Sequence, residues 1–83
     1  MENTQHIMAR IESHFDSMTD LEKRIANYFL SPSSIYDDLS SQKVAQTLYI
    51  SQAALTRFAK KCGFKGYREF NFQYIHQLQD KSE

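Results

Sequence analysis

The chain has 83 residues, of which 41% are hydrophobic and 13% are aromatic, and its formal net charge is zero. A chain of this length forms one small domain that buries roughly 60–65% of the surface its unfolded state exposes. This size excludes an enzyme with a deep pocket of its own, and the composition excludes a disordered chain. A single cysteine cannot form an internal disulfide, and no signal peptide or apolar run of about 18 residues is present, which predicts a cytoplasmic protein without a membrane span.

The spacing of the apolar residues predicts an all-α fold. Only two glycines and one proline interrupt the sequence, and between them the apolar residues recur at helical intervals. We therefore expect a small bundle of about five helices. The first helix carries Ile7, Ile11 and Phe15 four residues apart, which gives it one apolar stripe.

A capping box marks the start of the second predicted helix. Thr19 is followed by Glu22, so that the hydroxyl and the carboxylate each satisfy a free backbone N–H group. The helix is expected to end near Leu30, because Pro32 disfavours helical geometry in the residue before it.

Two short helices joined by a tight turn follow. Ser40 is the expected N-cap of a helix that runs to about Leu48, and Ser51 is the expected N-cap of the next, which ends at Gly63 in the left-handed conformation. Tyr49 stands where such a turn usually has glycine, and a positive φ there costs a non-glycine residue about 1 kcal/mol.

The residues inside this pair of helices fit a helix-turn-helix motif. A small residue is needed where the helices cross, and apolar residues must fill the angle between them. Six positions meet these needs: Val44, Ala45, Leu48, Ile50, Leu55 and Phe58.

The last predicted helix begins near Gly66 or Tyr67. One stripe holds Tyr67, Phe70, Tyr74 and Leu78, with Phe72 and Ile75 off it. The second face is either a dimer contact or a few exposed aromatic side chains. Residues 1–78 are expected to form the helix-turn-helix domain, and residues 79–83 a polar tail or the start of a linker.

The neutral total conceals a strong segregation of charge. Residues 1–38 carry a net charge of −4, residues 39–68 carry +6 with no acidic group, and residues 69–83 carry −2. A local basic patch acts independently of distant charges, because the Debye length in physiological salt is about 8 Å. A basic helix-turn-helix indicates binding to double-stranded DNA, and the alternative is a merely solvated basic face.

Residues that point outward from the second helix of the motif are the candidates for contact with DNA. Gln52 suits adenine, Arg57 suits guanine, Thr56 suits a thymine methyl group or a phosphate, and Ala53 is small enough to allow close approach. Other polar groups are better suited to backbone phosphates, and these are Lys43, Ser51, Lys60, Lys61, Lys65 and Arg68.

The sequence also resembles a known family. The part that carries the resemblance runs from Ser51 through Arg57-Phe58 and Lys60-Lys61 to Gly63-Phe64-Lys65-Gly66-Tyr67, with Tyr67 in place of a phenylalanine and Cys62 in place of a common leucine. It is similar to the N-terminal domain of RpiR-type transcriptional regulators over about residues 5–78.

The resemblance implies a bacterial repressor or activator of sugar-catabolism genes that acts as a homodimer on a two-fold symmetric operator. In that family a sugar-isomerase-like domain follows and senses a phosphorylated sugar, so a phosphosugar effector is expected to bind there and not to these residues.

Other functions are less well supported. A rival interpretation is a protein-interaction module that uses the aromatic residues Tyr67, Phe70, Phe72 and Tyr74 of the last helix. No catalytic set is present, so we do not expect an enzyme. No cysteine or carboxylate completes a zinc-like spacing with His6, His14 or His76, so neither a metal nor a cofactor is expected.

Overall fold

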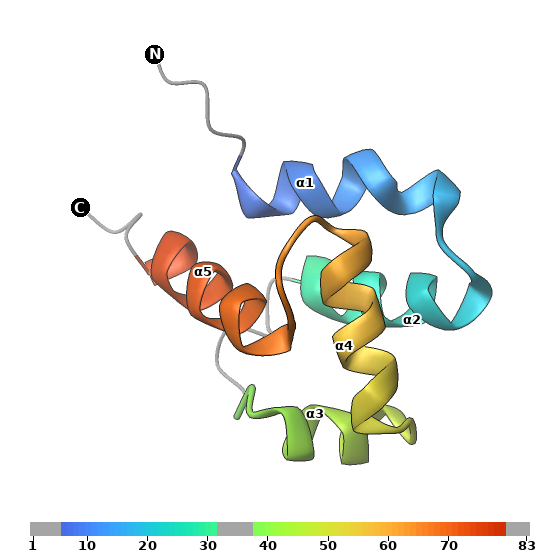
Figure 1. Cartoon of the computed structure of the whole chain (residues 1–83). Coiled ribbons are helices and arrows are strands. Elements are labelled where there is room, and N and C mark those ends of the chain that lie inside the picture. The colour runs from blue at the N-terminus through green and yellow to red at the C-terminus, as the bar shows by residue number, and fades with distance from the viewer. Residues whose placement is uncertain (1–5, 32–37, 80–83) are drawn as a thin grey trace.

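The computed structural model describes residues 6–31 and 38–79, which form helices and connections without a strand. This confirms the all-α prediction. Figure 1 shows α1 and α3 at opposite ends of the molecule, with α4 running between them. The elements are α1 (Ile7–His14), the 3-10 turn η1 (Phe15–Ser17), α2 (Asp20–Leu30), α3 (Ser41–Leu48), α4 (Gln52–Lys61) and α5 (Tyr67–Gln79).

The predicted capping box opens α2. The Glu22 N–H donates to the Thr19 hydroxyl at 3.1 Å, and the Thr19 N–H donates to the Glu22 carboxylate at 3.0 Å. The two residues therefore satisfy each other's free N–H groups, and α2 ends at Leu30 as expected.

Serine side chains cap both helices of the predicted helix-turn-helix. The Ser40 hydroxyl accepts from the Lys43 N–H at 3.3 Å at the start of α3. The Ser51 hydroxyl accepts from the Ala54 N–H at 3.1 Å at the start of α4. Both predicted N-caps are confirmed, so the short local sequence fixes where these two helices begin.

Phe29 of α2 lies at the centre of an aromatic core. Its ring centroid is 4.9 Å from that of Phe70 and 5.0 Å from that of Tyr74, both in edge-to-face geometry. It also stacks on Phe58 of α4 at 6.0 Å. Because these rings come from α2, α4 and α5, one cluster fixes the three helices relative to each other.

Two tyrosine hydroxyls inside the core bind backbone carbonyls. Tyr67 donates to the Leu39 carbonyl at 2.6 Å, and Tyr74 donates to the Phe29 carbonyl. Burial raises the pKa of Tyr67, so its hydroxyl keeps the proton that it donates. The rings therefore anchor α5 to the end of α2 and to the residue before Ser40.

The predicted stripe on α5 is largely confirmed. Tyr67, Phe70 and Tyr74 are buried, whereas Phe72 is 64% exposed and Ile75 is half-buried. The side chain of Leu78 lies outside the described part of the structure.

The apolar stripe of the first helix is shorter than predicted. Ile7 and Ile11 are fully buried in α1, but Phe15 falls in η1 and is half-buried. The helix tightens there, and the chain turns so that Met18 enters the core.

Arg10 joins α1 to the end of α4. Its guanidinium lies 4.1 Å from the ring centroid of Phe64 and donates to the carbonyls of Cys62 and Gly63, each at 3.3 Å. Gly63 has the predicted left-handed conformation, with φ of +97°. A side chain at Gly63 would also meet the guanidinium, because an added Cβ would lie 2.7 Å from Nη2 of Arg10.

Tyr49 adopts the strained conformation that the sequence predicts. Its φ is 60° and its ψ is 46°, in the left-handed region, and its side chain is 92% exposed. The conformational cost is therefore not offset by burial of the ring.

We predict that Tyr49→Gly raises the free energy of unfolding by roughly 0.5–1 kcal/mol, because glycine adopts this conformation without strain. Tyr49→Ala is the matched control, since it removes the ring but keeps the strain. Urea unfolding of the three proteins measures the difference. Equal stability of the Gly and Ala variants would contradict this account.

Cys62 is a packed thiol. It is fully buried, and this burial raises its pKa to about 11, although Arg10 acts in the opposite direction. At pH 8 roughly one thiol in a thousand would then be the reactive thiolate.

We predict that iodoacetamide at pH 8 labels Cys62 very slowly in the native protein and rapidly in urea. Mass spectrometry of the labelled protein over time measures both rates. Fast native labelling would show that the thiol is accessible and ionised.

Candidate nucleic-acid interface

Helices α3 and α4 and their turn form the predicted helix-turn-helix. Its inward-facing residues are those the sequence indicated: Val44, Ala45, Leu55 and Phe58 are buried, and Leu48 and Ile50 are half-buried. Ala54, which the sequence reasoning missed, is also buried. The packing of these residues determines which side chains of α3 and α4 face solvent.

Arg24 of α2 binds the turn between α3 and α4. Its guanidinium donates to the Leu48 carbonyl at 2.6 Å, which satisfies a free carbonyl at the end of α3. The turn that precedes α4 is therefore braced by a helix outside the motif.

The predicted base-reading residues lie on the first two turns of α4. Gln52, Ala53 and Arg57 are exposed. The end of α4 where the helix begins lies next to α3 and away from α1 (Figure 1). Thr56 differs from the expectation that it points outward: it is half-buried, and its hydroxyl donates to the Gln52 carbonyl at 3.4 Å. Its side chain faces the hollow described below rather than open solvent.

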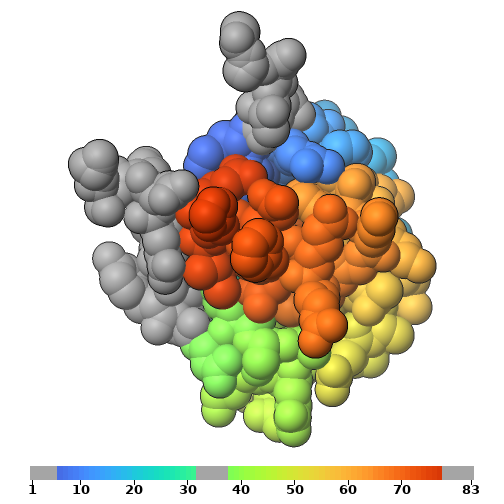
Figure 2. Space-filling view, turned by 60° about the vertical axis from the view of Figure 1, so that its left-hand side comes forward, coloured from blue at the N-terminus to red at the C-terminus, as the bar shows by residue number. Residues whose placement is uncertain are grey.

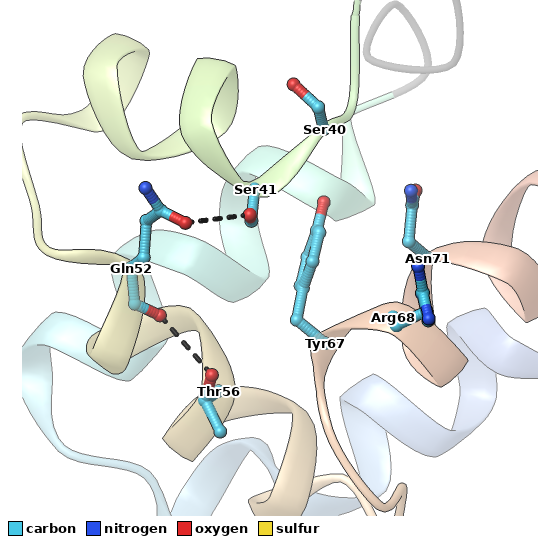
Figure 3. Close-up of a pocket in the computed structure, with 7 residues that line it drawn as sticks. All are labelled: Ser40, Ser41, Gln52, Thr56, Tyr67, Arg68 and Asn71. Atoms are coloured by element: carbon cyan, nitrogen blue, oxygen red, sulfur yellow. Dashed lines mark hydrogen bonds between the residues drawn. The ribbon is translucent and has the colours of Figure 1, made fainter.

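A hydrogen bond between the two helices orients Gln52. The Ser41 hydroxyl of α3 donates to Oε1 of Gln52 at 3.0 Å (Figure 3). This contact fixes the amide so that its Nε2 group remains available as a donor. Sequence reasoning did not identify Ser41, because nothing local relates it to a residue eleven positions later.

The predicted phosphate-binding residues fall into two groups. The first group lies near the starts of three helices: Lys43 is in the first turn of α3, Ser51 caps α4 and Arg68 is in the first turn of α5, and all three are exposed. The others, Lys60, Lys61 and Lys65, lie at or beyond the far end of α4.

The far group is separated from the predicted base-reading residues. Lys61 lies about 14 Å along α4 from Gln52, at 1.5 Å per residue. It is half-buried, and its ammonium donates to the Ser17 carbonyl at 3.2 Å. That contact directs it toward η1, whereas Lys60 and Lys65 are exposed.

A hollow of about 450 Å³ lies between α3, α4 and α5. Figure 2 looks onto this face, with α5 in the centre, α3 below it and α4 to its right. The hollow is lined by Ser40, Ser41, Gln52, Thr56, Tyr67, Arg68 and Asn71 (Figure 3). Asn71 was not predicted as a site residue, although its place three residues after Arg68 sets both on one side of α5.

Asp38 lies beside the hollow but does not line it. Its carboxylate accepts from the Ser40 N–H at 3.0 Å. The backbone and hydroxyl hydrogen bonds from Ser40, followed by the charge of Lys43, lower its pKa. This carboxylate is therefore engaged in starting α3.

The aromatic surface that a protein-interaction module would need on α5 is not exposed. Tyr67, Phe70 and Tyr74 point into the core, so α5 exposes Phe72 but not the set of four aromatic rings. The helical spacing of these aromatic residues therefore reflects their packing in the core and not an exposed binding surface.

The described residues offer neither a metal cluster nor a membrane-spanning helix. Within residues 6–31 and 38–79, no three His, Cys, Asp or Glu side chains are grouped so as to hold a metal ion. No helix in these ranges combines the length and the apolar character needed to cross a bilayer.

Comparison with known proteins agrees with the geometry. Residues 5–81 match the model of the family described as "Helix-turn-helix domain, rpiR family". The chain is 31% identical over 81 residues to an HTH-type transcriptional regulator of Haemophilus influenzae, and 32% identical over 76 residues to the HTH-type transcriptional regulator YfhH of Escherichia coli. These alignments cover 98% and 92% of this chain but 28% and 27% of the relatives, so the chain spans about a quarter of their length.

Proposed function

Because the chain belongs to the rpiR family of helix-turn-helix domains and is a DNA-binding domain of that type of regulator, we propose that it reads a specific operator through the first turns of α4. The family is one of transcription regulators and not of enzymes. The finer proposal concerns which residues read the DNA and how the whole regulator acts.

The exposed start of α4 carries this proposal. The helix buries Leu55 and Phe58 against the core while it leaves Gln52, Ala53 and Arg57 exposed. The N-terminal side chains of a recognition helix reach base edges in the major groove. Ala53 lies in sequence between the two long polar residues and is small enough to allow close approach.

Each of the residues proposed to read the DNA has a role that suits its chemistry. Arg57 donates two hydrogen bonds to guanine, and Gln52, oriented by Ser41, pairs with adenine. Thr56 contacts a thymine methyl group or a phosphate.

The basic residues contact the phosphates of the DNA backbone. Phosphate contacts fix the register of the protein on the duplex and carry little sequence information. Lys43, Ser51 and Arg68 flank the start of α4, and a phosphate at Ser51 also meets the free N–H groups of the helix N-terminus. The contacts of Lys60, Lys61 and Lys65 involve DNA farther along the duplex, and Lys61 must first leave the Ser17 carbonyl.

The regulator is proposed to act as a cytoplasmic homodimer. Two α4 helices would enter successive major grooves about 34 Å apart on a two-fold symmetric site. The exposed Phe72 and half-buried Ile75 on α5 give an apolar strip for that pairing. We further propose that the target genes serve sugar catabolism and that a phosphosugar effector acts through a separate C-terminal domain.

We predict that Gln52→Ala and Arg57→Ala each weaken operator binding by roughly 1–3 kcal/mol, because each removes a direct contact to a base. Fluorescence anisotropy with operator and with random DNA measures both affinities, and thermal unfolding checks the fold.

Arg57→Lys is the matched control for charge. It keeps the cation but loses the two-pronged geometry that guanine requires, so we expect it to bind the operator nearly as poorly as Arg57→Ala. Asn27→Ala, an exposed position on α2, is the neutral control. If the Gln52 and Arg57 variants lose equal affinity for operator and for random DNA, these residues do not read bases.

A further inference from the structure

The hollow between α3, α4 and α5 is lined by hydrogen-bond donors around one positive charge. Its lining contains the guanidinium of Arg68 and no carboxylate. Asp38, just outside the lining, accepts hydrogen bonds from Ser40 that lower its pKa and keep it ionised, and the nearby charge of Lys43 partly offsets its negative charge. The charge and the donor groups therefore favour an anion.

The beginning of α3 contributes one donor to this hollow. The Ser40 hydroxyl accepts from the Lys43 N–H and donates to the Asp38 carboxylate, so it is already engaged in capping the helix. The N–H of Ser41 lies in the first turn of α3 and has no acceptor within that helix. The positive end of the helix dipole adds to this donor.

Asn71 supplies an unusual feature on the opposite wall. Its Oδ1 atom is buried and has no hydrogen-bond partner among the residues the structure describes. An unpaired buried acceptor is unfavourable, so a donor is expected there in the functional state. Arg68 lies three residues earlier on α5, within reach of Asn71, and both line the hollow.

We propose that this hollow binds one backbone phosphate of the DNA, beside the base pairs that α4 reads. The proposal rests on the proposed DNA-binding function and adds a site to it. Arg68 donates to the phosphate oxygens and, with another of its five N–H groups, to Oδ1 of Asn71. Asn71 is thus a positioning residue that acts through Arg68, and the backbone N–H of Ser41 holds the phosphate from the other side.

The first test neutralises one phosphate at a time. Methylphosphonate is substituted at each position of the operator, and binding is measured for the wild type and for Arg68→Gln. At one position, methylphosphonate should weaken operator binding by the wild type about tenfold. The same substitution should barely weaken binding by Arg68→Gln, because this variant has already lost its contact to that phosphate. A plot of log affinity against log salt concentration should also be less steep for Arg68→Gln, by about the contribution of one phosphate contact. Lys23→Gln, outside the hollow, is the charge-matched control.

The second test separates positioning from folding. Asn71→Leu removes the unpaired acceptor and keeps a side chain of similar size, so the unfolding midpoint should stay the same or rise. Operator affinity should nevertheless fall severalfold, and the methylphosphonate effect at the identified position should shrink. A purely structural role for Asn71 predicts the reverse: a lower midpoint and an unchanged methylphosphonate profile.

Two outcomes would overturn the proposal. In the first, the wild type binds its operator but no methylphosphonate position depends on Arg68. In the second, inorganic phosphate at millimolar concentration shifts the Ser41 N–H signal in nuclear magnetic resonance spectra of the wild type but not of Arg68→Gln, again without a dependent position in the operator. The hollow would then take a small free anion. Failure of the wild type to bind any operator would instead contradict the proposed function itself.

Discussion

The packing of the Phe29 ring is the interaction on which the rest of the structure depends. It contacts rings from α4 and α5, and its own carbonyl accepts the hydroxyl of Tyr74. Since Phe58 stacks against it, the rotation of α4 about its axis is fixed. The face of α4 that carries Gln52 and Arg57 is therefore left toward solvent as a consequence of core packing.

A polar link extends this constraint to the start of α3. Tyr67 packs in the aromatic core and donates to the Leu39 carbonyl, one residue before the N-cap Ser40. Ser41 then reaches across to Gln52. The core, the cap of α3 and the orientation of Gln52 are consequently connected by a short series of contacts, so the side chain of Gln52, which we propose to face the DNA, is held in place by the core.

Local features of the fold could be predicted from the sequence. The Thr19–Glu22 capping box, the serine caps and the left-handed Gly63 each depend on residues a few positions apart, which is why their patterns are readable. The contacts that sequence reasoning missed join distant segments: Arg10 with Phe64, Lys61 with Ser17, and the walls of the hollow around Asn71. Periodicity identifies an inward face, but it does not state which helix will cover it.

The exposed start of α4 is proposed to read a specific DNA sequence. Selection of bound sequences from a random DNA library tests it most directly, because it reports the motif, its symmetry and its spacing together. We expect a two-fold symmetric motif whose half-site centres lie about one helical turn, or a multiple of it, apart. Recovery of no enriched sequence, with binding that depends on salt alone, would contradict it.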